Sequence, residues 1–192
     1  MTNLISSVAA GLIVLSSTLV HAAVAPAKVV ELAAHRLDRL VVTKKIDPGF
    51  SKNLRNITVK IDATKPPVYF MVTATQSTPA KGTPLQLDIS FDQNGRPLAF
   101  KQRAGGTPGT DAGWNKASAI TLMENGLHHA LDMRTDAKVK PYYDSLKSAT
   151  LTNGSLNGKQ VAQVQLATTT ATGKMNVYLN LDGSFVSMEI LP

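Results

Sequence analysis

The segment from Lys174 to Leu191 constrains the fold more than any other part of the chain. Its apolar residues alternate with polar ones, which is the period-2 pattern of a strand with one buried face. Asp182-Gly183 predicts a two-residue type I′ turn, because both central positions of that turn need a positive φ. All apolar side chains of the hairpin then fall on one face. The predicted facing pairs are Leu179–Val186, Val177–Met188 and Met175–Ile190.

A second segment, Leu85 to Lys101, has the same pattern, with Asn94-Gly95 as its turn. The predicted facing pairs are Phe91–Leu98 and Ile89–Phe100. Two further strands precede each hairpin, at about 54–61 and 68–75 in the first half and at 146–152 and 160–168 in the second. Asn153-Gly154 and Asn157-Gly158 indicate turns between the last two of these strands.

A helix is expected before each set of strands. From Lys28 to Lys44 the apolar residues recur at three- and four-residue spacing, which predicts an amphipathic helix that Asp47-Pro48-Gly49 ends. A second helix is expected from about Ala112 to Met133, although Gly126 in its interior lowers helix propensity by about 1 kcal/mol.

These patterns predict an α+β fold of two repeats, each a helix packed on a four-stranded antiparallel sheet. The first repeat spans residues 23–103 and the second 114–192, joined by a Gly/Pro-rich linker at 104–113. The two sheets either lie side by side or merge edge to edge into one sheet; the sequence leaves this open.

The N-terminal 22 residues predict a signal peptide. Leu4 to Val20 is apolar, and Val20-His21-Ala22 fits a small-x-small cleavage site, so the mature protein is expected to begin at Ala23 in the periplasm or outside the cell. An uncleaved membrane anchor is the alternative, since the first residues carry no Lys or Arg. The chain has no cysteine, so its stability has to come from its core.

The two hairpins carry a resemblance to known families. A helix followed by an antiparallel sheet with an Asp/Asn-Gly turn, as in Leu87–Gly95 and Val177–Gly183, resembles PepSY-type domains and, more loosely, cystatin-like folds. The resemblance implies a secreted, non-catalytic module that binds other proteins or inhibits peptidases. The Gln-x-Val-x-Gly loop of cystatins is not reproduced, because Gln160–Val164 lacks the glycine. The outline is also similar to periplasmic lipoprotein carriers, which enclose an acyl chain.

The formal net charge of +7 is partly concentrated in one segment. The residues proposed for a surface that binds anions or a partner protein are Arg36, Arg39, Lys44, Lys45, Lys52 and Arg55. A solvated basic face without a dedicated partner is the alternative. Specific nucleic-acid recognition is not expected, because few aromatic residues accompany these charges.

Patterns of known catalytic chemistry are missing from the sequence. It has no cysteine nucleophile, Gly-x-Ser-x-Gly elbow, phosphate loop or His-Glu-x-x-His pattern. Glu124, His128 and Asp132 share one helix face, where they could form a weak metal site or a solvated ion-pair stripe. Trp114 is either an anchor for a partner or part of the core.

We therefore expect an exported binding module of the protein-interaction or peptidase-inhibitory type, without enzymatic activity, cofactor or metal. The alternative is a periplasmic carrier of an apolar ligand such as a lipid.

Overall fold

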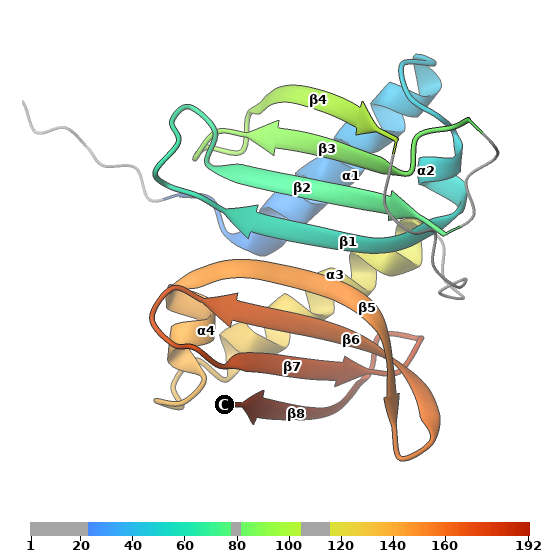
Figure 1. Ribbon diagram of the computed structural model, residues 1–192. Helices are drawn as coiled ribbons and strands as arrows, with labels where there is room; N and C mark the ends of the chain where they lie inside the picture. The colour runs from blue at the N-terminus through green and yellow to red at the C-terminus, as the bar shows by residue number, and fades with distance from the viewer. Residues whose placement is uncertain (1–22, 78–81, 105–115) are drawn as a thin grey trace, which may run out of the picture.

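The computed structural model describes residues 23–77, 82–104 and 116–192 (Figure 1). In both halves a long helix and a short helix precede four strands. The elements of the first half are α1 (Pro26–Val42), α2 (Gly49–Lys52), β1 (Leu54–Ile61), β2 (Phe70–Gln76), β3 (Gln86–Phe91) and β4 (Pro97–Arg103). Those of the second half are α3 (Lys116–Asp132), α4 (Lys140–Asp144), β5 (Leu146–Leu156), β6 (Lys159–Thr168), β7 (Lys174–Leu179) and β8 (Phe185–Leu191).

The strands of the described residues form one eight-stranded antiparallel sheet with the order β4-β3-β2-β1-β5-β6-β7-β8. The fold is therefore α+β, and the two halves merge edge to edge through β1 and β5. This junction is short, because the β1–β5 ladder contains only the pairs Thr58–Thr150, Val59–Ala149 and Lys60–Ser148. Every other ladder lies within one half.

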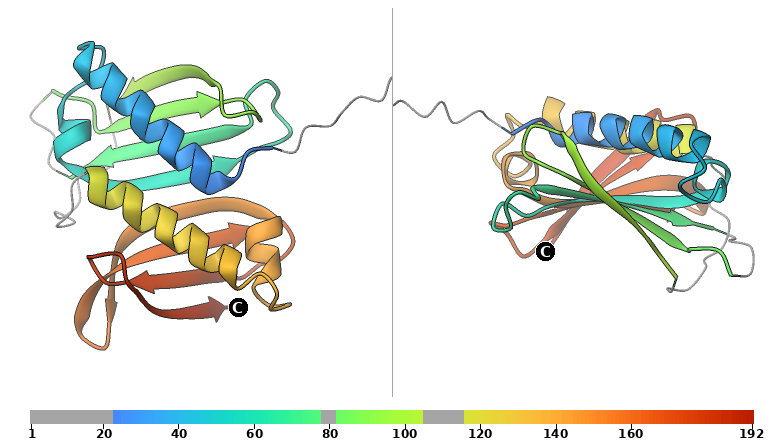
Figure 2. Two further views of the ribbon diagram at one scale, coloured as in Figure 1. Left: turned by 180° about the vertical axis from the view of Figure 1, so that it is seen from behind. Right: turned by 90° about the horizontal axis from the view of Figure 1, so that it is seen from above.

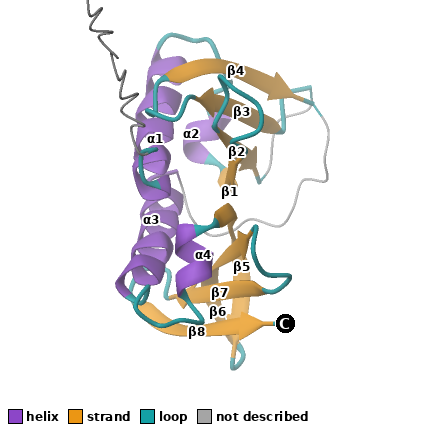
Figure 3. Ribbon diagram, turned by 90° about the vertical axis from the view of Figure 1, so that its left-hand side faces the viewer, coloured by secondary structure: helices purple, strands orange, loops and turns teal. Residues whose placement is uncertain are grey.

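The helices α1 and α3 lie against each other on one face of the sheet, and none of the described helices lies on the opposite face (Figures 2 and 3). Apolar side chains from both halves fill the space between helices and sheet as one core. Gly126 explains how closely α3 can approach: a Cβ atom at this position would lie 2.5 Å from Cγ2 of Val164 on β6. The glycine that lowers helix propensity is thus needed for packing.

The C-terminal hairpin has the predicted register but a different turn. Val177 faces Met188 and Met175 faces Ile190, as predicted. The loop has three residues instead of two, since the N–H of Asn180 donates to the carbonyl of Ser184. A β-bulge then restores the register, so that Leu179 faces Phe185, and the predicted Leu179–Val186 pair is wrong. Gly183 has a φ of +91°, which fits a type I turn followed by a left-handed residue.

The first hairpin repeats this geometry. Ile89 faces Phe100 as predicted, whereas Phe91 faces Pro97 and not Leu98, because a bulge lies at the same place in the ladder. Gly95 has a φ of +75°. Asp-Gly and Asn-Gly suit both turn types, so the sequence alone did not distinguish them.

The chain forms a type I′ turn at Asn157-Gly158, where φ is +52° and +77°. Asn153-Gly154, predicted as another turn, lies within β5 and pairs with β6. That prediction is wrong because β5 is longer than expected and continues to Leu156.

The short helices α2 and α4 were not predicted from the sequence. Each buries one aromatic side chain, Phe50 in α2 and Tyr142 in α4. Helix α1 ends at Val42, ahead of α2, and Lys44 adopts the left-handed conformation (φ +54°). The N–H of Lys45 donates to the carbonyl of Leu40 at 2.9 Å, which is the 6→1 hydrogen bond of a Schellman motif.

The first described residues are tied to the sheet. The N–H of Val24 donates to the carbonyl of Gln93 at 3.0 Å, which ties the start of the described chain to the β3–β4 turn. Over the ranges 23–77, 82–104 and 116–192, no helix has both the length and the apolar composition that crossing a membrane requires.

Candidate functional site

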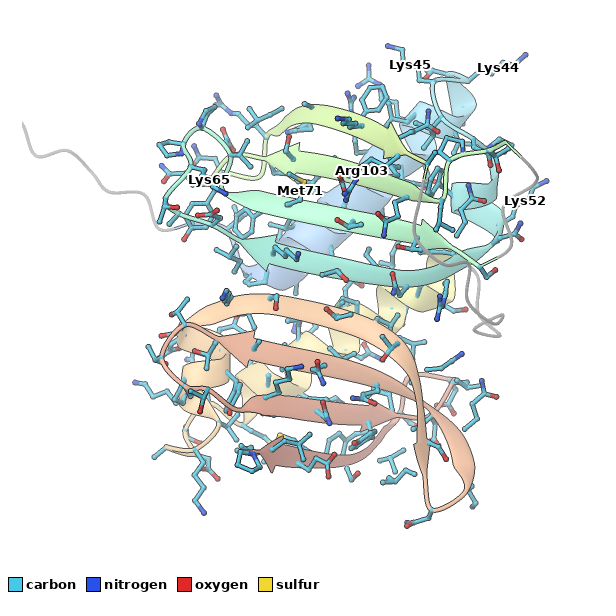
Figure 4. The ribbon with its side chains drawn as sticks, in the orientation of Figure 1. Lys44, Lys45, Lys52, Lys65, Met71 and Arg103 are labelled. Atoms are coloured by element: carbon cyan, nitrogen blue, oxygen red, sulfur yellow. The ribbon has the colours of Figure 1, made fainter. Side chains whose placement is uncertain are left out.

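The predicted basic residues occupy three places. Lys44 and Lys45 follow α1, Lys52 ends α2, and these three lysines lie at one end of the first half (Figure 4). Arg36 and Arg39 lie on α1, with Arg39 in its last turn, and Arg55 is the extra residue of a β-bulge in β1. A cation at the C-terminus of a long helix is stabilised by the helix dipole, which accounts for Arg39 in the last turn of α1 without a ligand.

Two other sequence candidates have different outcomes. Trp114 lies outside the described residues. Glu124, His128 and Asp132 belong to α3, but no group of three metal-ligating side chains occurs among the residues that the structure describes.

Glu124 instead takes part in the contact between the two long helices. Partial burial, followed by the nearby Glu31 carboxylate of α1, raises the pKa of Glu124 above its usual value of 4.5. Glu31 itself accepts hydrogen bonds from Nζ of Lys28 at 2.7 and 2.6 Å, and this lowers its pKa. A shallow pocket of about 330 Å³ lies between these groups and His128.

A cleft lies where the two halves meet. We name it the junction cleft; it has a volume of about 670 Å³. Its lining consists of Lys60–Thr64 and Tyr69 from the first half and of Asp144–Ser148 and Thr169 from the second. It opens where the β1–β5 ladder ends after the pair Lys60–Ser148. The cleft therefore follows from the divergence of two strands that pair only briefly.

The inner wall of the junction cleft is apolar and aromatic. Ile61, Leu146 and Tyr69 line it, and they also line an adjoining pocket of about 300 Å³. Phe70 and Tyr143 add further aromatic surface to that pocket. The rings of Tyr69 and Phe70 meet edge to face with centroids 4.7 Å apart, so this wall is held by packing.

The rim of the junction cleft carries two lysines, Lys60 and Lys147, and two aspartates, Asp62 and Asp144. Asp62 accepts a hydrogen bond from the Thr64 hydroxyl at 2.5 Å and forms an ion pair with Lys65 at 3.3 Å. These contacts lower the pKa of Asp62. Asp144 pairs with Lys140 at 3.5 Å. Within the described ranges, the rim lysines Lys60 and Lys147 have no ion-pair partner.

The helix-free face of the sheet carries polar networks. Asp88 forms a two-pronged ion pair with Arg103, at 2.7 and 2.8 Å, and accepts a hydrogen bond from Thr73 (Arg103 in Figure 4).

In the second half of this face, the Tyr178 hydroxyl donates a short hydrogen bond to Glu189. Buried Asn176 donates to Tyr178 at 3.2 Å and to Glu189 at 3.1 Å. Both networks join neighbouring strands, so they fix register.

Sequence reasoning missed the junction cleft. Lys60 and Lys147 belong to strands that were predicted separately, and nothing in the pattern indicates that these strands pair for three residues and then diverge. A signal that could have indicated the cleft is the position of Lys60 and Lys147, each near an end of the strand through which its half joins the other.

Comparison with known proteins does not assign a family. No family model matches the chain, and no curated protein matches it. A solved structure of a presumed lipoprotein from Clostridium difficile 630 is similar with a TM-score of 0.34 and 9% identity, over 81% of this chain and 91% of that chain.

Proposed function

We propose that this protein is an exported, non-catalytic binding module that holds an extended segment of another protein in the junction cleft. The observation that carries the proposal is the interruption of the sheet. The β1–β5 ladder stops after Lys60–Ser148, and an open cleft of about 670 Å³ begins there. An extended peptide suits such a place, because strand ends offer backbone hydrogen-bonding groups and the cleft receives side chains.

The lining indicates which peptides would bind. The apolar wall at Ile61, Leu146 and Tyr69 suits an apolar or aromatic side chain. Lys60 and Lys147 at the rim suit a carboxylate, because the acidic residues beside them already have partners. The proposed ligand is therefore an extended segment with an acidic residue next to an apolar one. Inhibition of a peptidase would be one form of such binding.

We further propose that the two halves are copies of one unit, with the boundaries expected from the sequence. The β3–β4 and β7–β8 ladders have the same register and the same bulge at an offset of 88 residues. The β1–β2 and β5–β6 ladders do so at an offset of 92. The carbonyl that follows each short helix, in Asn53 and Ser145, accepts a backbone hydrogen bond from Ser77 and Thr169 respectively.

Selection of peptides on the immobilised protein tests the proposed function. A random peptide library displayed on phage should be enriched in sequences with an acidic residue beside an apolar or aromatic one. The double variant Lys60→Glu, Lys147→Glu should weaken binding of the selected peptides by about tenfold or more, since two attractive charges become repulsive.

The control carries the same change of net charge at another place. Lys44→Glu, Lys45→Glu alters the lysines after α1, away from the junction cleft, and should leave binding of the selected peptides within about twofold of the parent. Unchanged binding by the Lys60/Lys147 variant would exclude the junction cleft. Loss of binding in the control alone would assign the peptides to the basic end of the first half.

The apolar-ligand carrier is a second proposal, favoured by the aromatic wall of the adjoining pocket. The space between helices and sheet is filled by core side chains, so an acyl chain would bind at Tyr69, Phe70 and Tyr143. Native mass spectrometry of the protein purified from its exported fraction separates the two proposals. A co-purified lipid that is lost in Tyr143→Ala supports the carrier.

A further inference from the structure

We propose that the protein forms a symmetric dimer in which strand β8 pairs with β8 of a second copy. This inference is independent of the proposed function, because β8 is at the outer edge of the sheet and the junction cleft is at its centre. Among the described residues, no strand pairs with the outer side of β8. An edge strand presents unpaired backbone groups that favour pairing with another strand.

The two edges of the sheet differ in how they are protected. Strand β4 starts with Pro97, which has no N–H to donate, and carries Lys101 and Arg103. Prolines and charges on an edge strand oppose pairing with other chains. Strand β8 carries one charged residue, Glu189, whose carboxylate is held on its own sheet by Tyr178 and Asn176. Both edge strands carry a β-bulge, at Leu98 and at Val186, but β8 lacks the proline and the basic charges that oppose pairing at β4.

Apolar side chains gather at the β8 edge. Five of the large hydrophobic residues that are exposed in the structure lie in β8 or its turn: Leu181 (43%), Phe185 (43%), Val186 (38%), Ile190 (39%) and Leu191 (40%). Exposed apolar surface of this kind is typical of interaction sites. Since these side chains flank a free strand edge, backbone pairing and apolar burial would act together.

A second copy fits this edge better than another partner because the edge is self-complementary. With Met188 on the two-fold axis of an antiparallel pair, Met188 faces its own copy. Ser187 then faces Glu189, and beyond this pair the bulged residues Phe185 and Val186 lie opposite Ile190 and Leu191. Apolar residues then face apolar ones, and the two Glu189 carboxylates do not face each other, which would be destabilising.

The charge distribution also favours a second copy at β8. With a net charge of +7, two copies repel each other over most approaches. The strand β8 has no basic residue, and the lysines Lys44, Lys45 and Lys52 lie in the first half, on the other side of the sheet's centre (Figure 4). The chain itself contains a contact of the proposed kind, since β1 and β5 join two four-stranded halves edge to edge with both helices on one side.

Sedimentation velocity over a range of concentrations tests the dimer, with protein purified from its exported fraction. The parent should sediment as a dimer, and Val186→Lys should weaken association by about tenfold or more, because it places a cation at the apolar edge. Leu98→Lys is the matched control: Leu98 lies 88 residues earlier, on β4, and is 43% exposed against 38% for Val186. The control should dimerise like the parent. A parent that stays monomeric overturns the proposal.

Cross-linking tests the register without relying on a destabilising change. Because the chain has no cysteine, Met188→Cys introduces a single thiol. Facing Cα atoms in antiparallel strands lie about 4.5–5.5 Å apart, within the range of about 4.4–6.8 Å that a disulfide needs. Mild oxidation should give a covalent dimer of Met188→Cys. The matched variant Phe100→Cys on β4 should remain monomeric, and the reverse result overturns the proposal.

Discussion

A Cβ atom on Gly126 would lie 2.5 Å from Cγ2 of Val164, closer than side chains approach each other in folded proteins. Val164 is fully buried in β6, and α3 crosses directly above it. The helix therefore contacts the sheet through its backbone at this point. In α1 the corresponding position, 93 residues earlier, is Ala33, which is buried and keeps its methyl group.

We expect Gly126→Ala to destabilise the protein. Alanine favours a helix by about 1 kcal/mol over glycine, but overpacking a core typically costs about 1–3 kcal/mol. The net loss in the free energy of unfolding should be about 1 kcal/mol, measured by urea denaturation. The loss should become smaller in a Val164→Ala background, because the side chain that the new methyl group meets has been shortened. A Gly126→Ala variant more stable than the parent would contradict this packing.

Glu124→Gln should stabilise the protein at neutral pH. The pKa of Glu124 is raised in the folded state by partial burial and by Glu31, so its ionisation opposes folding. The stability of the parent should fall as pH rises from the unfolded pKa of Glu124 through its folded pKa. The variant should lack this fall, and chemical denaturation at several pH values measures the difference.

Glu31→Gln is the control for that prediction. The pKa of Glu31 is lowered, mainly by the hydrogen bond from Lys28, so its ionised form favours folding. The contribution of Glu31 is present above its unfolded pKa and is lost as pH falls through the folded one. At pH 7, Glu124→Gln should therefore raise the free energy of unfolding and Glu31→Gln should lower it. Stabilisation by both, or by neither, would show that the two carboxylates are not placed as described.

The hairpins could be predicted because their cause is local. Alternation of apolar residues and an Asp-Gly or Asn-Gly pair identify two strands and the turn between them. The bulge at Val186 could not be predicted, because a three-residue loop followed by a bulge gives Val177 the same partner, Met188, as a two-residue turn does. The pairing register of the two strands is therefore the same for both turn types and does not distinguish them.

The junction cleft depends on contacts between distant parts of the chain. Thr58 and Thr150 meet at the start of the β1–β5 ladder, and their hydroxyls lie 3.4 Å apart. No local pattern indicates which strand edges join or how far the pairing extends. The basic residues were found because they cluster in one segment of the sequence. The structure brings Lys44, Lys45 and Lys52 to one end of the first half, and none of the three lines the junction cleft.

We expect the exported protein to begin at Ala23. The backbone N–H of Val24 donates to the carbonyl of Gln93, so a chain that begins at Ala23 keeps this contact with the β3–β4 turn. N-terminal sequencing of the protein from the periplasmic fraction measures the start directly. A chain that still begins at Met1 and sediments with membranes would mean that the first 22 residues act as an anchor.

Tyr178→Phe should raise the pKa of Glu189 toward its usual value of 4.5. The hydrogen bond from the Tyr178 hydroxyl is the main cause of the lowered pKa of Glu189, and Asn176 is the second. The ionised Glu189 stabilises the fold above its unfolded pKa, and this stabilisation is lost as pH falls through its folded pKa. In Tyr178→Phe the stabilisation from Glu189 should be smaller. Carbon-13 NMR titration of the Glu189 carboxyl measures the shift, and Asn176→Ala should give a smaller one.

The last prediction concerns the glycines of the hairpin turns. Gly183, Gly95 and Gly158 all have positive φ, at +91°, +75° and +77°, so alanine at any of them adopts a left-handed conformation that costs about 1–2 kcal/mol. They differ in their surroundings. A Cβ on Gly183 would lie 2.6 Å from Nδ2 of Asn125, and one on Gly95 would lie 2.6 Å from Cδ1 of Leu32. A Cβ on Gly158 would meet no atom within 4 Å.

Gly158→Ala therefore isolates the backbone strain, and the other two alanine variants add a steric contact to it. We expect Gly183→Ala and Gly95→Ala to lose more unfolding free energy than Gly158→Ala, by up to about 1–3 kcal/mol for the forced repacking. Ser187→Ala, a change on β8 away from these turns, should remain within about 0.5 kcal/mol of the parent. Leu32 and Asn125 lie 93 residues apart on α1 and α3, so equal losses at Gly95 and Gly183 would agree with two halves built alike. If all three glycine variants lose the same unfolding free energy, the two hairpin turns do not contact the helices closely. The described packing of the hairpins against α1 and α3 would then be wrong.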